Sequence, residues 1–246
     1  MSSFELAKRS AAFAAGEAYI RSGCRLGVGT GTTVKYVVDY LEEKIKEGKL
    51  SDIVCVPSSH MTRLLLLKAG IRIATFDETP ELDVYIDGAD EIDSNLNCIK
   101  GGCGCLVRER IVQSSSKHFV LIADNSKQSK YLGEQCETIP IEVVPFGYVP
   151  AINHIMKQEG GHCSLRASDV KSAEKIGPVI TDNNNYLLDW NFPKDQFRTT
   201  EDLLMLKKRL NDIPGVVDSG IFANVAEKAY IGSPEGSVLE IFSSNF

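Results

Sequence analysis

The chain has 246 residues, of which 43% are hydrophobic and 24% charged, so it is long enough for one large core and a smaller second domain. Its net charge of −6 argues against nucleic acid or an anionic membrane surface as the main partner, because both favour a basic protein. No signal peptide and no membrane-spanning apolar run is apparent, so we expect a cytoplasmic protein with no nucleic-acid or membrane partner.

The first 130 residues alternate between short apolar strands and helical stretches. In chain order they predict a helix over 4–21, a strand over 24–28, a helix over 32–47, a strand over 52–56, a helix after Ser59, strands over 71–75 and 82–86, a helix over 106–115 and a strand over 118–123. This alternation is typical of βαβ units around a mainly parallel, Rossmann-like sheet flanked by helices. Such sheets bind ligands at the carboxyl ends of their strands.

The pattern changes after Leu132. Strands are predicted over 139–144, 179–181 and 186–189, helices over 150–159 and 200–210, and further short β-runs over 216–222, 229–231 and 238–242. We therefore expect an α/β fold in which residues 1–132 and about 212–246 form the catalytic Rossmann-like domain. Residues from about 133 to 211 would form a smaller α+β domain.

A glycine- and threonine-rich loop, residues 27–33, lies between a predicted strand and a predicted helix. Its glycines let the backbone approach an anion closely, while N–H groups and hydroxyls can bind it, so the loop predicts a phosphate or carboxylate site. The alternative is a tight turn with a threonine cap. A second cluster, residues 58–62, either contacts a ligand or serves only for helix capping by Ser58.

Three acids within five residues, Asp87, Asp90 and Glu91, follow an apolar strand. Crowded carboxylates are typical of proton transfer, of metal binding or of a solvated acidic turn. Metal binding is less favoured, because Lys100 and a glycine-rich loop over 101–104 come next and supply a cation rather than oxygen ligands. Glu109 lies in the first turns of the following helix, where an isolated glutamate is usually a surface charge favoured by the helix dipole.

The seven cysteines and four histidines have neither disulfide-rich nor metal-ligand spacing. We expect the cysteines to be reduced thiols, and no metal or other cofactor is predicted.

Three strings in this order, residues 27–34, 87–92 and 99–112, resemble ribose-5-phosphate isomerase of the A type, and most closely its eukaryotic members. Residues 139–150, 177–186 and 213–222 also resemble that family, so the likeness covers essentially the whole chain. The sequence departs from the family pattern at Cys103, where glycine is usual, and at Arg110, where lysine is common.

The resemblance implies the reversible conversion of D-ribose 5-phosphate to D-ribulose 5-phosphate through an enediolate, in the non-oxidative pentose phosphate pathway and without a metal. It implies that Glu109 is the base, that Lys100 stabilises developing negative charge, and that Asp87 and Asp90 hold hydroxyls and assist proton transfer. The substrate-binding residues implied are Thr30, Gly31, Thr32, Thr33, Gly88, Ala89, Gly101, Gly102, Cys103, Lys127 and Lys8. The partner would be a pentose 5-phosphate, and the assembly a homodimer or homotetramer.

Three alternatives stay open. A CoA-transferase or glucosamine-phosphate deaminase of related fold would also use a glycine-rich loop and a carboxylate. A sugar-phosphate-binding sensor would need no catalytic base. A metal-dependent isomerase would lose its activity on chelation.

Overall fold

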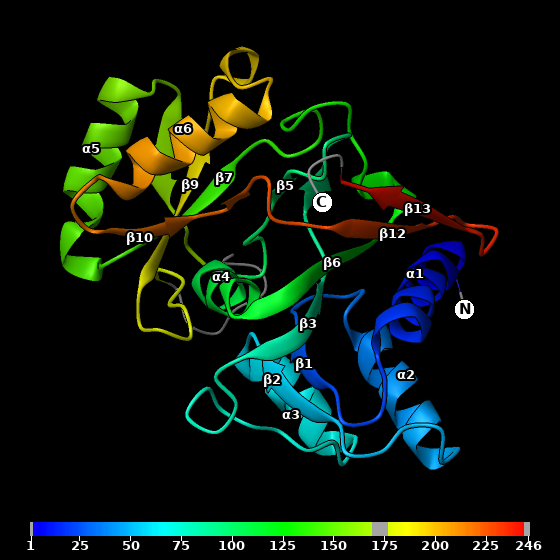
Figure 1. The fold of residues 1–246 in the computed structure, drawn as a ribbon. Helices are drawn as coiled ribbons and strands as arrows, with labels where there is room; N and C mark the ends of the chain where they lie inside the picture. Colours follow the sequence, from blue (N-terminus) through cyan, green and yellow to red (C-terminus); the bar gives the residue numbers. More distant parts are fainter. Residues whose placement is uncertain (1, 169–176, 244–246) are drawn as a thin grey trace. The chain divides into compact units, whose positions relative to one another are not determined.

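The structure, a computed structural model, describes residues 2–168 and 177–243 (Figure 1). The chain divides into two compact units. The first unit comprises Met1–Ala89, Arg108–Gln128 and Asn224–Phe246, and the second comprises Asp90–Val107 and Ser129–Ala223. The domain boundaries expected from the sequence, near residues 132 and 212, stay a prediction. Among the described residues, no helix is both long and apolar enough to cross a membrane.

The first unit is built on a six-stranded sheet in the order β13-β12-β6-β3-β1-β2 (Figure 1). Its strands are β1 (Arg25–Val28), β2 (Val54–Pro57), β3 (Leu82–Asp87), β6 (Ser116–Asp124), β12 (Lys228–Gly232) and β13 (Val238–Phe242). All neighbouring strands are parallel except the pair β12 and β13. The central strands are apolar and buried on both faces, which is typical of a parallel sheet covered by helices. The predicted mainly parallel sheet is therefore confirmed.

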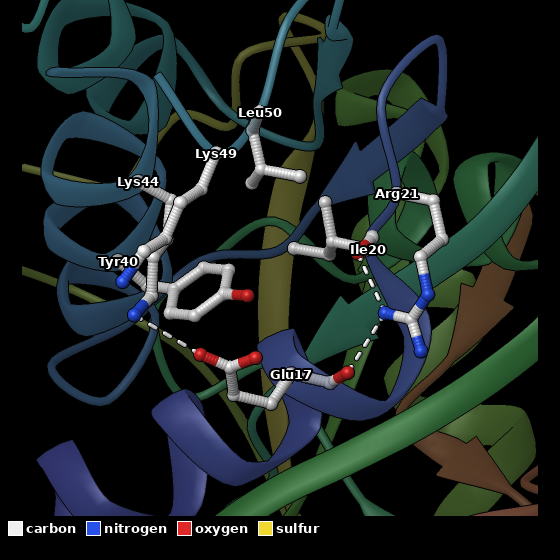
Figure 2. Close-up of a pocket in the computed structure, with 7 residues that line it drawn as sticks. All are labelled: Glu17, Ile20, Arg21, Tyr40, Lys44, Lys49 and Leu50. Atoms are coloured by element: carbon white, nitrogen blue, oxygen red, sulfur yellow. Dashed lines mark hydrogen bonds and ion pairs between the residues drawn. The ribbon is translucent and has the colours of Figure 1, made fainter. Parts of the chain in front are cut away.

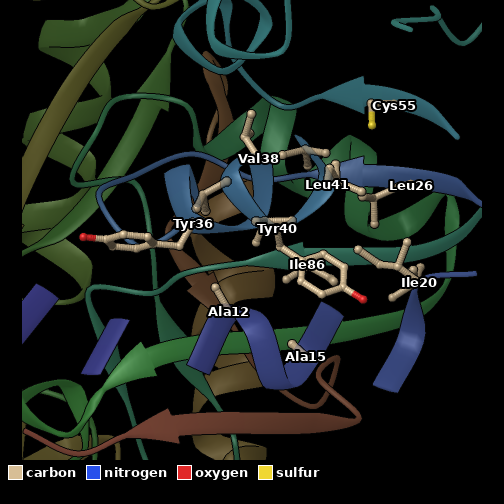
Figure 3. Close-up of a cluster of buried hydrophobic side chains, with 14 of the residues drawn as sticks. Ala12, Ala15, Ile20, Leu26, Tyr36, Val38, Tyr40, Leu41, Cys55 and Ile86 are labelled. Carbon is tan, nitrogen blue, oxygen red and sulfur yellow. The ribbon is translucent and has the colours of Figure 1, made fainter. Parts of the chain in front are cut away.

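Four helices belong to or enter this unit: α1 (Ser3–Tyr19), α2 (Lys35–Lys46), α3 (His60–Lys68) and α4 (Leu106–Ser114). Helix α1 begins at the capping residue Ser2, whose side chain accepts a hydrogen bond from the N–H of Glu5. Its buried face is made of alanines and Gly16, which let the helix lie close to the sheet. A Cβ on Gly232 would come within 1.9 Å of the carbonyl oxygen of Ala7. Figure 3 shows the resulting core, where α1 and α2 contribute Ala12, Ala15, Tyr36, Val38, Tyr40 and Leu41, and the strands Leu26, Cys55 and Ile86.

The second unit contains two antiparallel sheets. The larger has the order β10-β7-β9-β8, and the smaller the order β11-β5-β4. Their strands are β4 (Glu91–Ile92), β5 (Cys98–Ile99), β7 (Ile139–Val143), β8 (His162–Leu165), β9 (Tyr186–Asn191), β10 (Val216–Ser219) and β11 (Ile221–Phe222). Helices α5 (Tyr148–Gln158) and α6 (Thr200–Asn211) form a core with one face of the larger sheet, centred on the buried Trp190. This is the smaller α+β unit expected from the sequence.

Several predicted strands differ from the structure. Residues 71–75 form only a single bridge between Ile73 and Cys55, and residues 179–181 only a bridge between Ile180 and Tyr186. The run over 216–222 is divided at Gly220, so that its halves join different sheets. Strands β4, β5 and β8 were not predicted; β4 and β5 have two residues each, too few for an alternating pattern.

Candidate active site

The loops singled out in the sequence lie along one edge of the parallel sheet. Because β1, β2, β3 and β6 are parallel, their carboxyl ends share that edge. The loop over 27–33, the cluster over 58–62, residues 87–89 and the short 3₁₀ helix η1 (Asn125–Lys127) follow these four strands. The structure thus brings together, within the first unit, the polar segments that the sequence predicted to meet.

Asp87 organises the glycine-rich loop. This buried carboxylate accepts hydrogen bonds at Oδ1 from the backbone N–H groups of Thr30 (2.9 Å) and Gly88 (2.7 Å), and at Oδ2 from the hydroxyl of Tyr85. A Cβ on Gly29 would lie 1.9 Å from Oδ1 of Asp87, so only glycine fits there. Because three protein donors already bind Asp87, its proposed contact with sugar hydroxyls stays a prediction.

Buried hydroxyls fix the other side of this loop. The Thr30 hydroxyl hydrogen-bonds to that of Ser58 at 2.8 Å, and the Thr62 hydroxyl donates to the carbonyl of Gly29 at 2.6 Å. Helix α3 is capped by Ser59, whose side chain accepts from the N–H of Thr62 at 3.1 Å. The predicted alternative, capping of this helix by Ser58, was therefore wrong by one residue. The Ser58 side chain instead forms a hydrogen bond with the glycine-rich loop.

Glu109 is 2% exposed, so its interpretation as an ordinary surface charge is wrong. Helix α4 packs on β1, where a Cβ on Gly27 would lie 2.6 Å from Cγ1 of Val112. Glu109 lies one turn before Val112 on the same helix face, nearer the loop that follows Gly27. Its charge also acts on Tyr85, whose pKa is raised well above its usual range by burial and by the nearby carboxylates of Asp87 and Glu109. The two predicted catalytic carboxylates of the first unit thus both raise the pKa of Tyr85, and Asp87 also accepts its hydroxyl hydrogen bond.

Tyr85 was not identified from the sequence. The signal available was its position two residues before Asp87 on a strand, which places both side chains on the same face of the sheet.

Lys8 contacts the exposed end of the glycine-rich loop. Its Nζ donates to the Thr32 hydroxyl at 3.1 Å and lies 3.7 Å from a carboxylate oxygen of Glu5. Helix α2 has Val34 as its N-cap with no side-chain hydrogen bond, so the alternative of a threonine cap is wrong. The remaining predicted binding residues of this unit follow its parallel strands at the same sheet edge: Gly31, Thr33 and Ala89 on loops, and Lys127 at the end of η1.

The second unit holds Lys100 at the end of β5. Its backbone N–H donates to the carbonyl of Gly220 at 2.9 Å, and its Nζ lies 5.6 Å from the centre of the Phe222 ring. The lysine is only 2% exposed. Burial of an ammonium group strengthens its effect on any negative charge that forms beside it.

Asp90 and the loop after Lys100 form one hydrogen-bonded group. The Gly102 N–H donates to Oδ2 of Asp90 at 2.7 Å, and a Cβ on Gly102 would lie 2.6 Å from Oδ1 of the same carboxylate. Gly101 has a φ of +101°, in the region that favours glycine. Cys103 is exposed. The Gly102 N–H is bound to Asp90 here, so the predicted role of Gly102 in substrate binding stays a prediction.

A pocket of about 360 Å³ lies at the opposite, amino edge of the parallel sheet. Figure 2 shows its lining residues, which are Glu17, Ile20, Arg21, Tyr40, Lys44, Lys49 and Leu50. Lys44 pairs with Glu17 at 3.1 Å, and Arg21 donates to the carbonyls of Glu17 and Ile20 at 2.7 Å each. Lys44 is thus paired with a carboxylate and Arg21 is hydrogen-bonded to the backbone. The pocket contains none of the predicted site residues.

Comparison with known proteins identifies the family of the chain. A family model described as ribose 5-phosphate isomerase A (phosphoriboisomerase A) matches residues 54–236. A probable ribose 5-phosphate isomerase of Caenorhabditis elegans is 46% identical over 98% of this chain and 93% of its own length. The ribose-5-phosphate isomerase of Homo sapiens is 43% identical over 97% of this chain and 74% of its own.

Two solved structures are similar over nearly the whole chain. The ribose 5-phosphate isomerase of Plasmodium falciparum superposes with a TM-score of 0.86 at 38% identity, covering 96% of this chain and 98% of that one. A D-ribose-5-phosphate isomerase in complex with phospho-erythronic acid has the same TM-score at 36% identity, covering 96% and 97% of the two chains. These matches in sequence and fold place the chain in the class of α/β sugar-phosphate isomerases.

The chain belongs to the ribose 5-phosphate isomerase A family. The resemblance predicted from the sequence is therefore confirmed, and with it the class of enzyme, an aldose–ketose isomerase.

Proposed function

We propose that this chain interconverts D-ribose 5-phosphate and D-ribulose 5-phosphate with Glu109 as the base, in the pentose phosphate pathway. The observation that carries the proposal is a glutamate only 2% exposed, on a helix that packs against β1, while Asp87 binds the glycine-rich loop that follows β1. A carboxylate with no catalytic or structural task is rarely buried, because burial without compensation is costly.

The reaction needs a single base. The Glu109 carboxylate takes the proton from C2 of the open-chain aldose, the C–H electrons form a C1=C2 double bond, and the carbonyl oxygen O1 becomes negative. The same proton, returned at C1, gives the ketose, while the hydroxyl proton moves from O2 to O1. General-base catalysis of this kind contributes a factor of about 10² to 10⁴.

The remaining barrier is lowered by charge. In our proposal the Lys100 ammonium and backbone N–H groups of the loop over 101–103 stabilise the enediolate oxygens. Support comes from the burial of Lys100 and from the hydrogen bonds that hold its backbone and the adjoining loop in place. Asp90 would then exchange its hydrogen bond with Gly102 for one with a sugar hydroxyl.

We assign the substrate phosphate to the exposed end of the glycine-rich loop. Thr32 is exposed there with the Lys8 ammonium 3.1 Å from its hydroxyl. Lys127 follows strand β6, which β3 separates from β1 in the sheet. A cation beside backbone N–H groups suits a phosphate dianion. Thr30 contributes mainly by holding the loop, since its hydroxyl is engaged with Ser58.

The test is the Glu109→Gln variant, with Glu43→Gln on α2 as a control that removes a carboxylate elsewhere in the same unit. Glu109→Gln is expected to lower kcat by about a hundredfold or more while changing substrate affinity little. In deuterium oxide, the wild type should place solvent deuterium at C1 of part of the ribulose 5-phosphate, and the variant should not. Near-normal turnover by Glu109→Gln would remove Glu109 from this role, and a wild type with no isomerase activity would favour a sugar-phosphate-binding sensor.

The proposal includes a homodimer or homotetramer in the cytoplasm. Helix α3 exposes Met61, Leu64 and Leu67, three residues apart on one face, and each is about half exposed. We assign this face to contact with a second copy of the chain. Light scattering of the wild type and of Leu64→Glu tests the assembly, and cell fractionation tests the location.

A further inference from the structure

Arg166 lies directly after β8, on the face of the larger antiparallel sheet that α5 and α6 do not cover. Its backbone N–H donates to the carbonyl of Leu187 at 2.8 Å, so Arg166 continues the pairing of β8 with β9. Asp189, two residues further along β9, is then its diagonal neighbour on the same face. The guanidinium pairs with Asp189 through two hydrogen bonds, Nε to Oδ2 at 2.8 Å and Nη2 to Oδ1 at 2.5 Å.

The third nitrogen of this guanidinium binds the loop after Lys100. Nη1 donates to the carbonyl oxygens of Gly101 and Gly102, each at 3.1 Å. The loop also packs on the same face of the sheet. A Cβ on Gly101 would lie 3.1 Å from Pro140, and a Cβ on Gly104 would lie 3.3 Å from Leu187. Arg166 therefore joins a strand of the sheet to two successive peptide units of the loop.

Holding these two carbonyls also fixes the directions of two N–H groups. In a trans peptide the C=O of one residue and the N–H of the next are coplanar and point in opposite directions. Arg166 binds the Gly101 carbonyl while Asp90 binds the Gly102 N–H at 2.7 Å, so this peptide unit is held from both sides. The Gly102 carbonyl, bound to Arg166, likewise directs the Cys103 N–H away from the guanidinium.

We propose that Arg166, held by Asp189, is a positioning residue for the isomerase reaction. It sets the orientation of the Gly102 and Cys103 N–H groups beside Lys100, the groups to which we assign stabilisation of the enediolate. The inference rests on the proposed function, because it assigns Arg166 an effect on catalysis rather than only on folding.

Arginine suits this task better than lysine. Its planar fork occupies both oxygens of Asp189 and still leaves Nη1 for the loop, whereas an ammonium group has no fixed fork. Gly101, with a φ of +101°, and Gly102 lack side chains that would restrict their peptide units. Within the loop, the Gly104 N–H donates to the Gly101 carbonyl at 3.0 Å, and Arg166 adds a bond to this carbonyl and one to the carbonyl of Gly102. Small displacements of groups that contact a transition state are costly, on the order of a hundredfold for about 1 Å.

The experiment compares Arg166→Met and Arg166→Lys with Arg209→Met. Arg209 forms a similar two-bond pair with Glu159, at 2.7 and 2.9 Å, in the same unit, which makes it a matched control for the loss of an ion pair. We expect Arg166→Met to lower kcat by roughly 10- to 100-fold with a KM changed less than about threefold. The kcat of Arg166→Lys should fall between those of Arg166→Met and the wild type, and the kcat of Arg209→Met should match that of the wild type.

Two inhibitors separate positioning from general damage. Phospho-erythronic acid, the ligand in the solved relative, carries a carboxylate that resembles the enediolate oxygens, and inorganic phosphate occupies only the phosphate subsite. Arg166→Met should weaken inhibition by phospho-erythronic acid by about the factor lost in kcat/KM, and leave inhibition by phosphate unchanged. Equal weakening of both inhibitors, or a folded Arg166→Met with kcat within about twofold of wild type, would overturn the inference.

Amide hydrogen exchange provides a measurement that does not depend on turnover. Residues 101–104 should exchange faster in Arg166→Lys, which keeps the positive charge beside Asp189, than in the wild type or in Arg209→Met. Unchanged exchange would contradict the loop contact itself. A wild type without isomerase activity but with faster exchange in the variant would reject the proposed function and leave the positioning contact intact.

Discussion

Replacing Gly29 by alanine should disrupt the candidate site from within the first unit. The new Cβ would lie 1.9 Å from Oδ1 and 2.1 Å from Cγ of Asp87, distances that no relaxation of a few tenths of an ångström can accommodate. Asp87 would have to move, and its Oδ1 would lose the hydrogen bonds from Thr30 and Gly88. The carboxylate is fully buried, so water cannot replace these donors.

The expected cost follows from those two bonds. Hydrogen bonds to a charged group are worth about 1.5 to 3 kcal/mol each, so Gly29→Ala should lower the free energy of unfolding by about 3 kcal/mol or more. For a protein of this size that corresponds to a melting temperature lower by roughly 6 to 12 °C. Turnover should fall as well, because the glycine-rich loop depends on Asp87 for its position.

Gly88→Ala is the matched control for stability. A Cβ on Gly88 would meet only the carbonyl oxygen of Ile122, at 3.7 Å, which is an ordinary contact. In urea denaturation, the free energy of unfolding should decrease several times more for Gly29→Ala than for Gly88→Ala. If Gly29→Ala unfolds within about 0.5 kcal/mol of the wild type, the close contact with Asp87 is not what requires glycine at this position.

Three further substitutions test other parts of the first unit. Tyr85→Phe removes a buried donor to Asp87 and should lower the free energy of unfolding by about 1 to 3 kcal/mol in urea denaturation; an unchanged midpoint would refute the bond. Hydrogen bonds from Arg25 hold the pKa of Asp83 well below its usual range. The pair therefore stabilises the folded protein at pH values above the pKa of Asp83 in the unfolded chain, about 3.9, and this stabilisation is lost as the pH falls through the pKa of Asp83 in the folded protein. Asp83→Asn should therefore be less stable than the wild type at pH 7, by about 1 kcal/mol because the pair is partly exposed. The difference in the free energy of unfolding should shrink toward pH 2, and a difference independent of pH would contradict this explanation. Lys8→Met should raise the KM for ribose 5-phosphate about tenfold with little change in kcat, and an unchanged KM would exclude Lys8 from the phosphate site.

Local patterns in the sequence were sufficient for the architecture and for the carboxyl-edge loops. Alternating apolar runs predicted the parallel sheet, and the polar segments after its strands predicted where they meet. Local sequence patterns did not predict which side chain caps a helix. Ser58 and Ser59 are equally good capping residues by type, and the hydrogen bond of Ser58 with Thr30 leaves Ser59 to cap α3.

Contacts between distant residues could not be predicted in this way. Arg166 is separated from Gly101 by 65 residues in the sequence and has no motif around it, so its link to the loop depends on the register of β8 and β9. The burial of Glu109 is similar, because it arises from the close approach of α4 to Gly27 rather than from the composition of the helix.

The path of the chain through the parallel sheet has a consequence for biosynthesis. Strand β6 lies between β3, which precedes it, and β12, which is formed by residues 228–232. On the ribosome, β6 emerges more than 100 residues before β12, so one of its edges has no native neighbour while these residues are being synthesised. An exposed apolar strand edge is prone to pair with other chains, so the arrival of β12 removes a site of unwanted pairing as well as completing the sheet.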